Sequence, residues 1–386
     1  MDILRFTGLK NGKIEPLENE SGSQWAFVPD PLPGKFVMTE ALWPLIASAR
    51  DSAARLEKID GILQDPFLLL RPLQQREAIV SSRLEGTYVM ADQILLFDIE
   101  QEGAHAMKIP ASAHESDLLE VWNHYEALRQ GHAWLVSGKP LDQSLILQIH
   151  KILMTGVRGK DRSPGEFRKC QVLVGRSLNS YVPPPPEFIQ PCMDRLVEFM
   201  QSGDVRDPLL KSFLVHYQLE AIHPFEDGNG RVGRVLLSLC VASWMSFTLP
   251  WLYMSEYFER HRREYNERLF AISCNSEWAE WIEFCAQGVI EQSKASLARC
   301  ERLRKLRDEF NQIADTLGPR MRKIIEMLFE RPVIIASQIS KVCSVSSESA
   351  RQDLYKLVEA GIVSELDRQR PKAFACLRII QAAHGD

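Results

Sequence analysis

The chain has 386 residues, of which 45% are hydrophobic and 25% are charged, and its formal net charge is −5. This composition is typical of a globular protein with two or three domains, and the negative charge argues against a general nucleic-acid coat. No run of residues approaches the eighteen consecutive apolar positions of a membrane span, and the N-terminus lacks the apolar core of a signal peptide. The eight cysteines form no Cys-x-x-Cys pair. We therefore expect a cytoplasmic protein with reduced thiols and no membrane partner.

The first part of the chain predicts an arm followed by helices. Residues 1–36 contain several prolines and are expected to be irregular. Apolar residues then recur at helical spacing over Thr39–Ile62, which predicts a long helix. A second helix passes through Arg76 and ends at Gly86, because glycine suits the position just after a helix. Further helices are predicted over residues 88–99, 112–130 and 141–155.

Residues 170–183 predict a β-hairpin, because two β-rich runs lie on either side of the polar turn Gly175–Ser180. The prolines that begin at Pro183 stop the second strand, since proline offers no N–H group to a sheet. A lone hairpin on a helical domain leaves one strand edge exposed, and such an edge can pair with a segment of another protein. The alternative is that the hairpin binds no partner and has no functional role.

Titratable side chains, charged side chains and glycines are concentrated in residues 223–234, which read His-Pro-Phe-Glu-Asp-Gly-Asn-Gly-Arg-Val-Gly-Arg. Helices are predicted over residues 187–202, 207–222, 229–247 and 256–273. The motif thus joins two helices and places Gly228, Asn229 and Gly230 at the N-terminus of the second one. Unpaired N–H groups and the helix dipole favour an anion at such a place. Arg231 and Arg234 are three residues apart and share one helix face, so a polyphosphate fits best.

The last segment has a different character, with 15 basic and 12 acidic residues after position 300. Three short helices are predicted around residues 324–328, 336–342 and 346–360, followed by a β-hairpin with a basic tip. This order resembles a winged helix, in which the third helix would present an outer face. That face comprises Ser347, Glu348, Arg351, Gln352 and Lys356. Because the charge is modest, DNA and a protein stay open as partners of residues 319–386.

The motif resembles the signature of Fic-domain proteins, His-x-Phe-x-(Asp/Glu)-Gly-Asn-Gly-Arg-x-x-Arg, and every specified position is matched. Most members transfer AMP from ATP to a hydroxyl group of a target protein. The resemblance implies that His223 is the general base and that Asp227 holds Mg²⁺. It also implies the ATP-binding residues Gly228, Asn229, Gly230, Arg231, Arg234, Tyr265 and Asn266. Members often have two tyrosines where this chain has Tyr265 and Asn266, so the adenine contact departs from the family pattern.

Two further segments resemble parts of the same family. Self-inhibited members carry (Ser/Thr)-x-x-x-Glu-(Gly/Asn), which Ser81, Glu85 and Gly86 match. In those members the glutamate pairs with the second motif arginine and occupies the γ-phosphate position. The predicted hairpin resembles the family's flap, which aligns the target segment as an added strand. The resemblance implies docking residues Leu173, Val174, Gly175 and Arg176.

The sequence therefore predicts a mainly α fold, a helical Fic core with a small β-hairpin flap followed by a C-terminal winged helix-turn-helix. The expected divisions are residues 1–110 (arm and inhibitory helix), 111–300 (catalytic domain), 301–318 (linker helix) and 319–386. The expected activity is AMP transfer from ATP, with Mg²⁺, to a Ser, Thr or Tyr hydroxyl of a target protein or of the chain itself. De-AMPylation, transfer of another phosphoryl-bearing group, and a DNA-binding regulator that only senses ATP remain alternatives. A homodimer also remains open.

Overall fold

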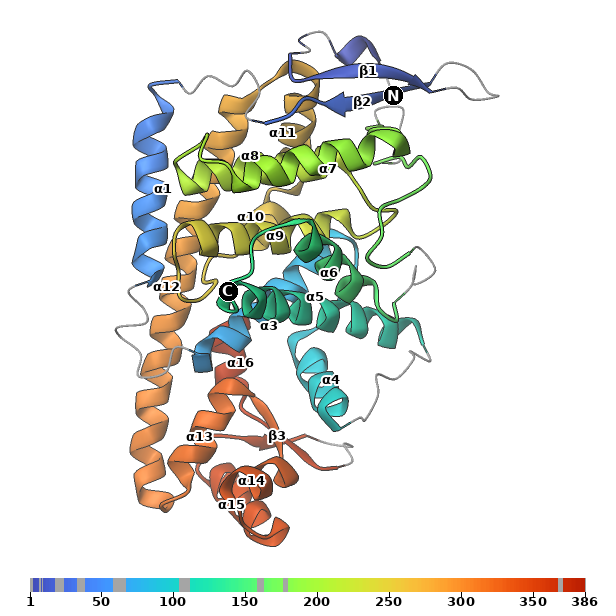
Figure 1. Cartoon of the computed structure of the whole chain (residues 1–386). Helices are drawn as coiled ribbons and strands as arrows, with labels where there is room; N and C mark the ends of the chain where they lie inside the picture. Colours follow the sequence, from blue (N-terminus) through green and yellow to red (C-terminus); the bar gives the residue numbers. More distant parts are fainter. Residues whose placement is uncertain are drawn as a thin grey trace.

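The protein is described by a computed structural model, in which helices predominate and two small sheets lie at opposite ends of the molecule (Figure 1). The described residues are 3–6, 8, 10–17, 24–32, 39–57, 67–103, 112–157, 163–175, 180–366 and 371–385. Among them no helix is both long enough and apolar enough to cross a lipid bilayer. The mainly helical architecture agrees with the class predicted from the sequence.

The N-terminal arm is not irregular, as the sequence suggested, but contains a short 3-10 helix (Ile3–Arg5) and an antiparallel pair of strands. Strand β1 (Gly12–Leu17) pairs with β2 (Gln24–Pro29) in a register that places Gly12 opposite Pro29. The apolar side of β2 is buried because Phe27 packs against Phe6, and the pair lies on the helical body next to α11. The strands form because this body covers one of their faces, which a local proline count does not reveal.

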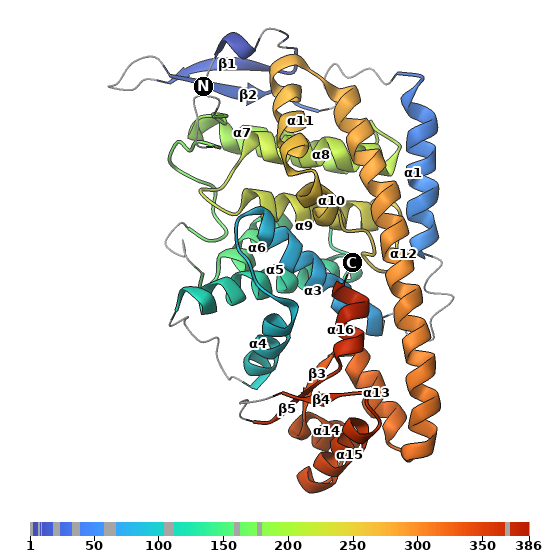
Figure 2. The same cartoon turned by 180° about the vertical axis from the view of Figure 1, so that it is seen from behind.

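The helical body is built from layers of helices, with α8 (Pro208–Ile222) and α9 (Asn229–Trp244) at its centre (Figures 1 and 2). Both helices are buried over nearly their whole length, which explains why their sequences are apolar on all sides. Their neighbours are α5 (Ala113–Val136), α6 (Gln143–Met154) and α7 (Pro186–Gln201). The two central helices are joined by residues 223–228, so the motif lies within the most buried part of the fold.

Helix α3 (Phe67–Leu84) packs against α5 and α10 (Ser255–Arg260), and its C-terminal end approaches the start of α9. Helix α4 (Ala91–Gly103) follows it. The helix predicted over residues 256–273 is instead two helices, α10 and α11 (Arg262–Asn275), which divide at His261. The helix predicted over Thr39–Ile62 is α1 (Leu42–Glu57), and residues 58–62 of that prediction lie outside the described part of the chain.

One long helix, α12 (Trp278–Leu317), runs along the molecule and packs against α1 and α13 (Met321–Glu330) (Figure 1). Its residues after position 300 form the segment predicted as a linker helix, and it ends at Leu317, just before Gly318. Beyond it follow β3 (Val333–Ile335), α14 (Ala336–Cys343), α15 (Ser347–Glu359), β4 (Ser364–Glu365), β5 (Ala373–Ala375) and α16 (Leu377–His384). The three strands are antiparallel in the order β3-β5-β4, and α13 and α16 contact α3.

Candidate active site

The loop between α8 and α9 turns sharply at both ends. His223 caps α8 in the left-handed conformation (φ 50°), and its N–H donates to the carbonyl of Leu219 at 2.9 Å. Gly228 caps the start of α9 with φ 77°, which only glycine adopts without strain. A non-glycine residue in this conformation costs about 1–2 kcal/mol, so the surrounding fold must hold His223 in place. The turn directs the chain so that His223 and Asp227 line the same cavity.

Asn229 fixes the inside of this loop with its side chain. Its Oδ1 accepts from the N–H of Phe225 at 2.9 Å, and its Nδ2 donates to the carbonyl of the same residue at 2.8 Å. The ring of Phe225 is fully buried and stacks on His150 with 3.8 Å between centroids. His150 accepts from the N–H of Gly165 and donates through Nε2 to the carbonyl of Asp227. The Asn229 amide therefore shapes the loop, and its backbone N–H is the group it can offer to a phosphate.

Arg168 joins the motif loop to the base of the flap. Its Nε donates to the carbonyl of His223 at 2.9 Å, and its backbone N–H donates to Pro224 at 2.9 Å. Its two terminal nitrogens donate to the carbonyls of Cys170 (2.9 Å) and Pro184 (2.5 Å). Burial lowers the pKa of Arg168 to about 10. This role could not be read from the sequence, because the side chain bonds to three carbonyls, two of which, those of His223 and Pro184, are distant in sequence.

The second motif arginine is bound to the predicted inhibitory segment. Nε of Arg234 donates to the hydroxyl of Ser81 at 2.7 Å, and Nη2 donates to Oε1 of Glu85 at 2.6 Å and to the carbonyl of Ser81 at 3.0 Å. Burial alone would raise the pKa of the Glu85 carboxyl, but the charge and hydrogen bond of Arg234 outweigh it, and the pKa is lowered. A Cβ atom at Gly230 would lie 2.5 Å from Oε1 of Glu85. Glycine at 230 therefore lets this carboxylate lie against the first turn of α9.

Gly86, the third residue of the predicted inhibitory motif, follows Glu85 with φ 96°. A Cβ atom there would meet nothing within 4 Å, so its conformation rather than crowding favours glycine. Its N–H donates to the carbonyl of Arg83 at 3.0 Å, which ends the helix. The turn places the next residue, Thr87, beside α5.

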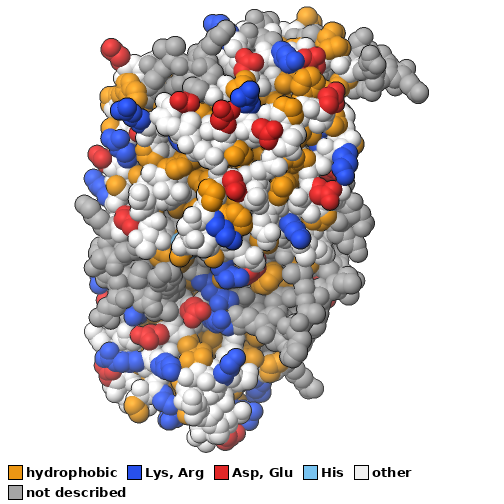
Figure 3. Space-filling view, in the orientation of Figure 1, with side chains coloured by type: hydrophobic (Ala, Val, Ile, Leu, Met, Phe, Trp, Pro, Cys, Tyr) orange, Lys and Arg blue, Asp and Glu red, His pale blue; other side chains and the backbone are white. Residues whose placement is uncertain are grey.

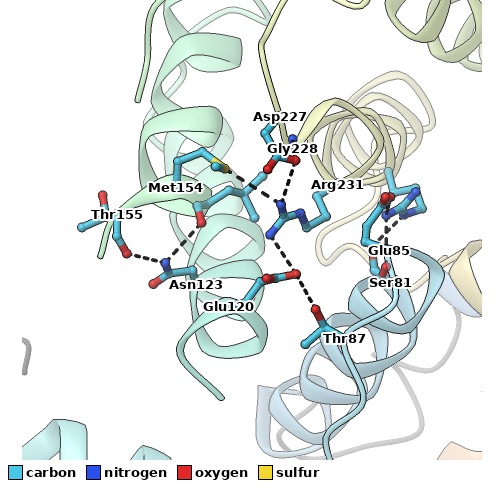
Figure 4. Close-up of polar contacts among 12 residues, drawn as sticks. Ser81, Glu85, Thr87, Glu120, Asn123, Met154, Thr155, Asp227, Gly228 and Arg231 are labelled. Carbon is cyan, nitrogen blue, oxygen red and sulfur yellow. Dashed lines mark hydrogen bonds and ion pairs between the residues drawn. The ribbon is translucent and has the colours of Figure 1, made fainter. Parts of the chain in front are cut away.

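The first motif arginine has different partners (Figure 4). Nη1 of Arg231 lies 3.0 Å from Oε1 of Glu120 on α5, and Nη2 lies 3.6 Å from Oδ1 of Asp227. The same Glu120 oxygen accepts from the hydroxyl of Thr87 at 2.9 Å. The side chain of Arg231 is only 5% exposed, so its charge is balanced inside the protein. Glu120 was not anticipated from the sequence, because it lies outside every recognised motif.

The imidazole of His223 is neutral at physiological pH, because burial lowers its pKa to about 4 and the nearby charge of Arg168 lowers it further. A neutral imidazole can accept a proton from a hydroxyl group. Glu220 lies one turn earlier on α8 and lines the same cavity. Burial raises the pKa of Glu220 to about 7. Its Oε1 would be 2.3 Å from a Cβ at position 233, which explains the glycine between the two motif arginines.

The cavity has a volume of about 980 Å³, which suits a nucleotide together with part of a second substrate. It extends from the motif loop along α11 to the N-terminal arm. The residues that line it include Glu85, Leu173, Val174, Gly175, His223, Asp227, Gly228, Asn229, Gly230, Arg234, Tyr265 and Asn266. The cavity thus brings together most of the residues selected from the sequence.

The predicted adenine contacts lie on α11, a helix that lines the cavity. Tyr265 is buried, and its hydroxyl donates to Nε2 of His216 at 2.9 Å, so this hydroxyl is already used inside the protein. Asn266 is exposed and lines the cavity. Of this pair, Asn266 is the side chain available to a ligand.

The flap forms less β-structure than the sequence suggested. Among the described residues of the flap, a single antiparallel bridge joins Val174 and Tyr181, with two hydrogen bonds of 2.9 Å between their backbones. Leu173 is 60% exposed beside this bridge. Arg176 and the rest of the turn lie outside the described residues. On the other side, the N–H of Phe27 in β2 donates to Val182 at 2.9 Å, so the N-terminal strands support the flap.

Asp227 fits the role of a Mg²⁺ ligand. Its carboxylate is 42% exposed and lines the cavity, and its Oδ1 accepts from the N–H of Gly228 at 2.7 Å. Among the described residues no group of three or more His, Cys, Asp or Glu side chains could hold a metal by itself. Mg²⁺ typically binds through one or two carboxylates together with phosphate oxygens of a substrate. A metal here would therefore depend on Asp227 and a bound nucleotide.

Comparison with known families agrees with this geometry. The Fic/DOC family model matches residues 140–241, and the model of the Fic/DOC family N-terminal domain matches residues 43–133. Together these ranges make up half of the chain. It is a Fic/DOC family protein. The family region contains the motif loop, and the N-terminal region contains Glu85 and Glu120.

Curated relatives connect this Fic/DOC protein to protein adenylyltransferases. A probable protein adenylyltransferase of Aquifex aeolicus is 26% identical over 152 residues, which is 38% of this chain and 46% of that protein. Protein adenylyltransferase Fic of Drosophila grimshawi is 32% identical over 136 residues, which is 34% of this chain and 27% of that protein. The matches thus span less than half the length of these relatives. The relationship to adenylyltransferases is distant.

Solved structures share the fold. A Fic family protein from Desulfovibrio desulfuricans superposes with a TM-score of 0.55 at 18% identity and covers 88% of this chain and 97% of that one. A fragment of Fic-1 from Caenorhabditis elegans gives a TM-score of 0.51 at 21% identity and covers 67% of this chain and 73% of that one. At these identities the likeness concerns the fold alone.

Proposed function

We propose that this protein transfers AMP from ATP to a Ser, Thr or Tyr hydroxyl group of a target protein or of itself, and that Glu85 restrains the reaction. The observation that carries the proposal is the position of Arg234. This buried guanidinium binds Glu85 at 2.6 Å on the wall of the cavity that also contains His223 and the N-terminus of α9. His223 can act as a base, and the N-terminus of α9 can bind phosphate. Glu85 competes for the arginine that a nucleotide would need. Such a site suits a nucleotide whose binding is restricted by the protein itself.

In the proposed reaction, the hydroxyl oxygen of the target forms a bond to the α-phosphorus of ATP while the bond from that phosphorus to the bridging oxygen breaks. Pyrophosphate leaves, and the hydroxyl proton passes to the neutral imidazole of His223. The N–H groups of Gly228, Asn229 and Gly230 would bind phosphate oxygens at the start of α9. Mg²⁺, when bound through Asp227, would neutralise phosphate charge. Arg168 holds the carbonyl of His223 and so keeps the base at the cavity wall.

Restraint follows from competition for one cation. Arg234 would bind the γ-phosphate of ATP, as the family resemblance implies, but in the present arrangement it donates to Glu85. An incoming polyphosphate must displace the carboxylate and also meets its like charge. Ser81 adds two bonds to the same guanidinium, which hold Arg234 toward α3.

The test compares wild type, Glu85→Gly and Glu85→Gly/Arg234→Ala at matched ATP and Mg²⁺, with transfer of labelled AMP measured on the chain itself and in lysate. We expect Glu85→Gly to increase labelling by about tenfold or more, since loss of a charge-assisted contact of about 1.5–3 kcal/mol frees the arginine. Arg234→Ala on that background should reduce labelling again. Glu187→Gln, a change of an acidic residue on α7, serves as the charge control. Equal labelling by wild type and Glu85→Gly would show that Glu85 has only a structural role.

We further propose that residues 319–386 form a winged-helix-like segment that contacts a protein rather than DNA. The order α13, β3, α14, α15, β4, β5 supports the first part. On the predicted outer face, Arg351 lies 3.3 Å from Glu348, and Lys356 lies 3.7 Å from Asp353. Figure 3 shows basic and acidic side chains interspersed over this part of the visible face. Paired charges leave little net attraction for a phosphate backbone.

Binding of the full chain to labelled duplex DNA tests this choice of partner. We expect no measurable change in fluorescence anisotropy at low salt, where phosphate contacts are strongest. Binding that weakens steeply with added salt, and that Arg351→Ala reduces, would instead assign DNA to this segment.

A further inference from the structure

A carboxylate outside the motif lies between the inhibitory segment and the candidate metal ligand. Oε1 of Glu120 is 3.0 Å from Nη1 of Arg231 and 2.9 Å from the hydroxyl of Thr87, which donates to it. On its other side, Nη2 of Arg231 is 3.6 Å from Oδ1 of Asp227. Figure 4 shows these four side chains in one row, from the turn after α3 to the start of α9.

We propose that Glu120 is a positioning residue that draws Arg231 away from Asp227, leaving the Asp227 carboxylate available to a divalent cation, and that Thr87 of the inhibitory segment orients it. The proposal rests on the proposed function, because it concerns the same nucleotide and metal site. It assigns to the N-terminal family region a part in building the site as well as in restraining it.

The first step of the argument is competition for one guanidinium. Arg231 faces two carboxylates, and the distance to Glu120 is shorter than the distance to Asp227. Because Arg231 is only 5% exposed, its charge cannot turn to water and must remain with one of them. If Glu120 lost its charge, the other carboxylate that pairs with Arg231 within 4 Å would be that of Asp227, and in the Glu85→Gly parent the charge of Glu85 is absent as well. A closer Arg231–Asp227 pair would compete directly with a bound cation.

The second step is the limited room around Arg231. Sδ of Met154 lies 4.0 Å from Nη2 on the side of α6. The same sulfur lies 3.0 Å from where a Cβ at Gly228 would be. With this wall on one side and α5 on the other, the guanidinium has few positions besides those beside Glu120 and Asp227. Whether Arg231 pairs with Glu120 or with Asp227 therefore determines how much negative charge Asp227 can offer to a cation.

The third step is the link to the inhibitory segment. Thr87 follows Glu85 by two residues, and its backbone N–H donates to the carbonyl of Ser82 at 3.0 Å. Its hydroxyl then fixes the Glu120 oxygen that faces Arg231. A single short turn therefore carries one carboxylate to Arg234 and one hydrogen-bond donor to Glu120. Loss of the Thr87 hydroxyl should weaken the orientation of Glu120 but leave its charge.

The experiment measures cation binding without turnover. Mn²⁺ binding is followed by electron paramagnetic resonance in the presence of α,β-methylene-ATP, which cannot transfer AMP. The parent is the full-length Glu85→Gly protein, compared with the same protein carrying Glu120→Gln, Glu120→Asp or Thr87→Val. We expect Glu120→Gln to raise the Kd for Mn²⁺ about fivefold, the change that about 1 kcal/mol of lost ion pairing produces. Thr87→Val should raise it about twofold, and Glu120→Asp, which keeps the charge, should restore most of the affinity.

Two controls separate positioning from damage and from failure of the proposed function. Affinity for the nucleotide analogue without metal should be the same for Glu120→Gln and the parent within error, and circular dichroism should show that Glu120→Gln is folded at the assay temperature, although loss of a buried ion pair lowers its Tm. Thr316→Val, an exposed threonine on α12, should leave the Kd for Mn²⁺ unchanged. Equal Mn²⁺ affinity in the parent and Glu120→Gln would overturn the inference. A parent that binds neither the analogue nor Mn²⁺ would overturn the proposed function itself.

Discussion

His223 shows how a single residue gains its chemistry from its place in the fold. A solvated histidine has a pKa of about 6.5, so a fraction of such side chains is charged at neutral pH. Here burial lowers the pKa of His223 to about 4, and the imidazole is neutral and able to accept a proton. Its left-handed backbone and the bond from Arg168 to its carbonyl keep it at the cavity wall. The imidazole is therefore in the protonation state that the proposed base requires before a substrate binds.

A pH prediction follows from this lowered pKa. As pH falls, activity should be lost only when His223 becomes protonated, so the acid limb of kcat/KM should lie near pH 4 and not near 6.5. The measurement is AMP transfer by Glu85→Gly from pH 4 to 8, with circular dichroism to confirm that the protein stays folded. His223→Ala should abolish transfer at every pH while ATP binding persists. An acid limb near pH 6.5 would mean that the imidazole is solvated during the reaction.

Local residue patterns predicted the helices and the motif loop but not the contacts that complete the site. Periodicity located α6 to α9 to within about three residues at each end, because each buries apolar residues, whereas α5 ends six residues beyond its predicted end at 130. The Fic signature located His223 and its neighbours. Arg168, His150 and Glu120 were missed because their partners are distant in sequence and meet only through packing. A single sequence carries no local pattern for such meetings.

At the scale of elements, the flap and the motif loop behave as one unit because Arg168 bonds to both. Its four bonds reach the loop at His223 and Pro224 and the flap at Cys170 and Pro184. The N-terminal strands add support from outside through Phe27, which also explains why a segment rich in proline forms strands at all. An element that would be marginal alone is held by contacts to its neighbours.

Arg168→Ala should therefore lower kcat strongly while leaving ATP affinity nearly unchanged. The buried carbonyls would lose their donor, at about 1–3 kcal/mol for each group left unsatisfied, and His223 would lose its position. We expect kcat to fall about a hundredfold, as is typical when a positioned base is misplaced. The measurement is kcat and KM for ATP in the Glu85→Gly background. Lys169→Ala, an exposed neighbour, is the control, and a change confined to KM would contradict the positioning role.

At the scale of the whole molecule, α3 lies between the Fic core and the C-terminal segment. One side of the helix packs on α5 and α10, and the other contacts α13 and α16. At this junction Nη2 of Arg76 lies 3.1 Å from Glu256, whose carboxylate also accepts from Arg299 at 2.7 Å. Arg76 also donates to the carbonyl of His384 at the end of α16. Helix α3 carries Ser81 and is followed directly by Glu85. The contact with α16 therefore helps to hold this helix in place.

This arrangement predicts that Arg76→Ala raises basal AMP transfer in protein that retains Glu85. Without Arg76, α3 loses its bond to α16, and Glu256 keeps only its other arginine partners. We expect the free energy of unfolding to fall by about 1–3 kcal/mol, the usual cost of an unsatisfied buried group. Looser support for α3 should shift Glu85 away from Arg234 more often, so basal labelling should increase.

The matched control is Arg378→Ala, which breaks an exposed pair with Glu309 (2.7 Å) that ties α16 to α12 and does not involve α3. An exposed pair contributes about 0–1 kcal/mol, so Arg378→Ala should change the Tm little and leave basal labelling at the wild-type level. Thermal unfolding and labelling with radioactive ATP are measured on both variants at matched concentration. If Arg76→Ala lowers the Tm but leaves labelling unchanged, the C-terminal segment supports α3 without influencing Glu85. If labelling rises only with Arg76→Ala, the restraint on Arg234 extends through α3 to the end of the chain.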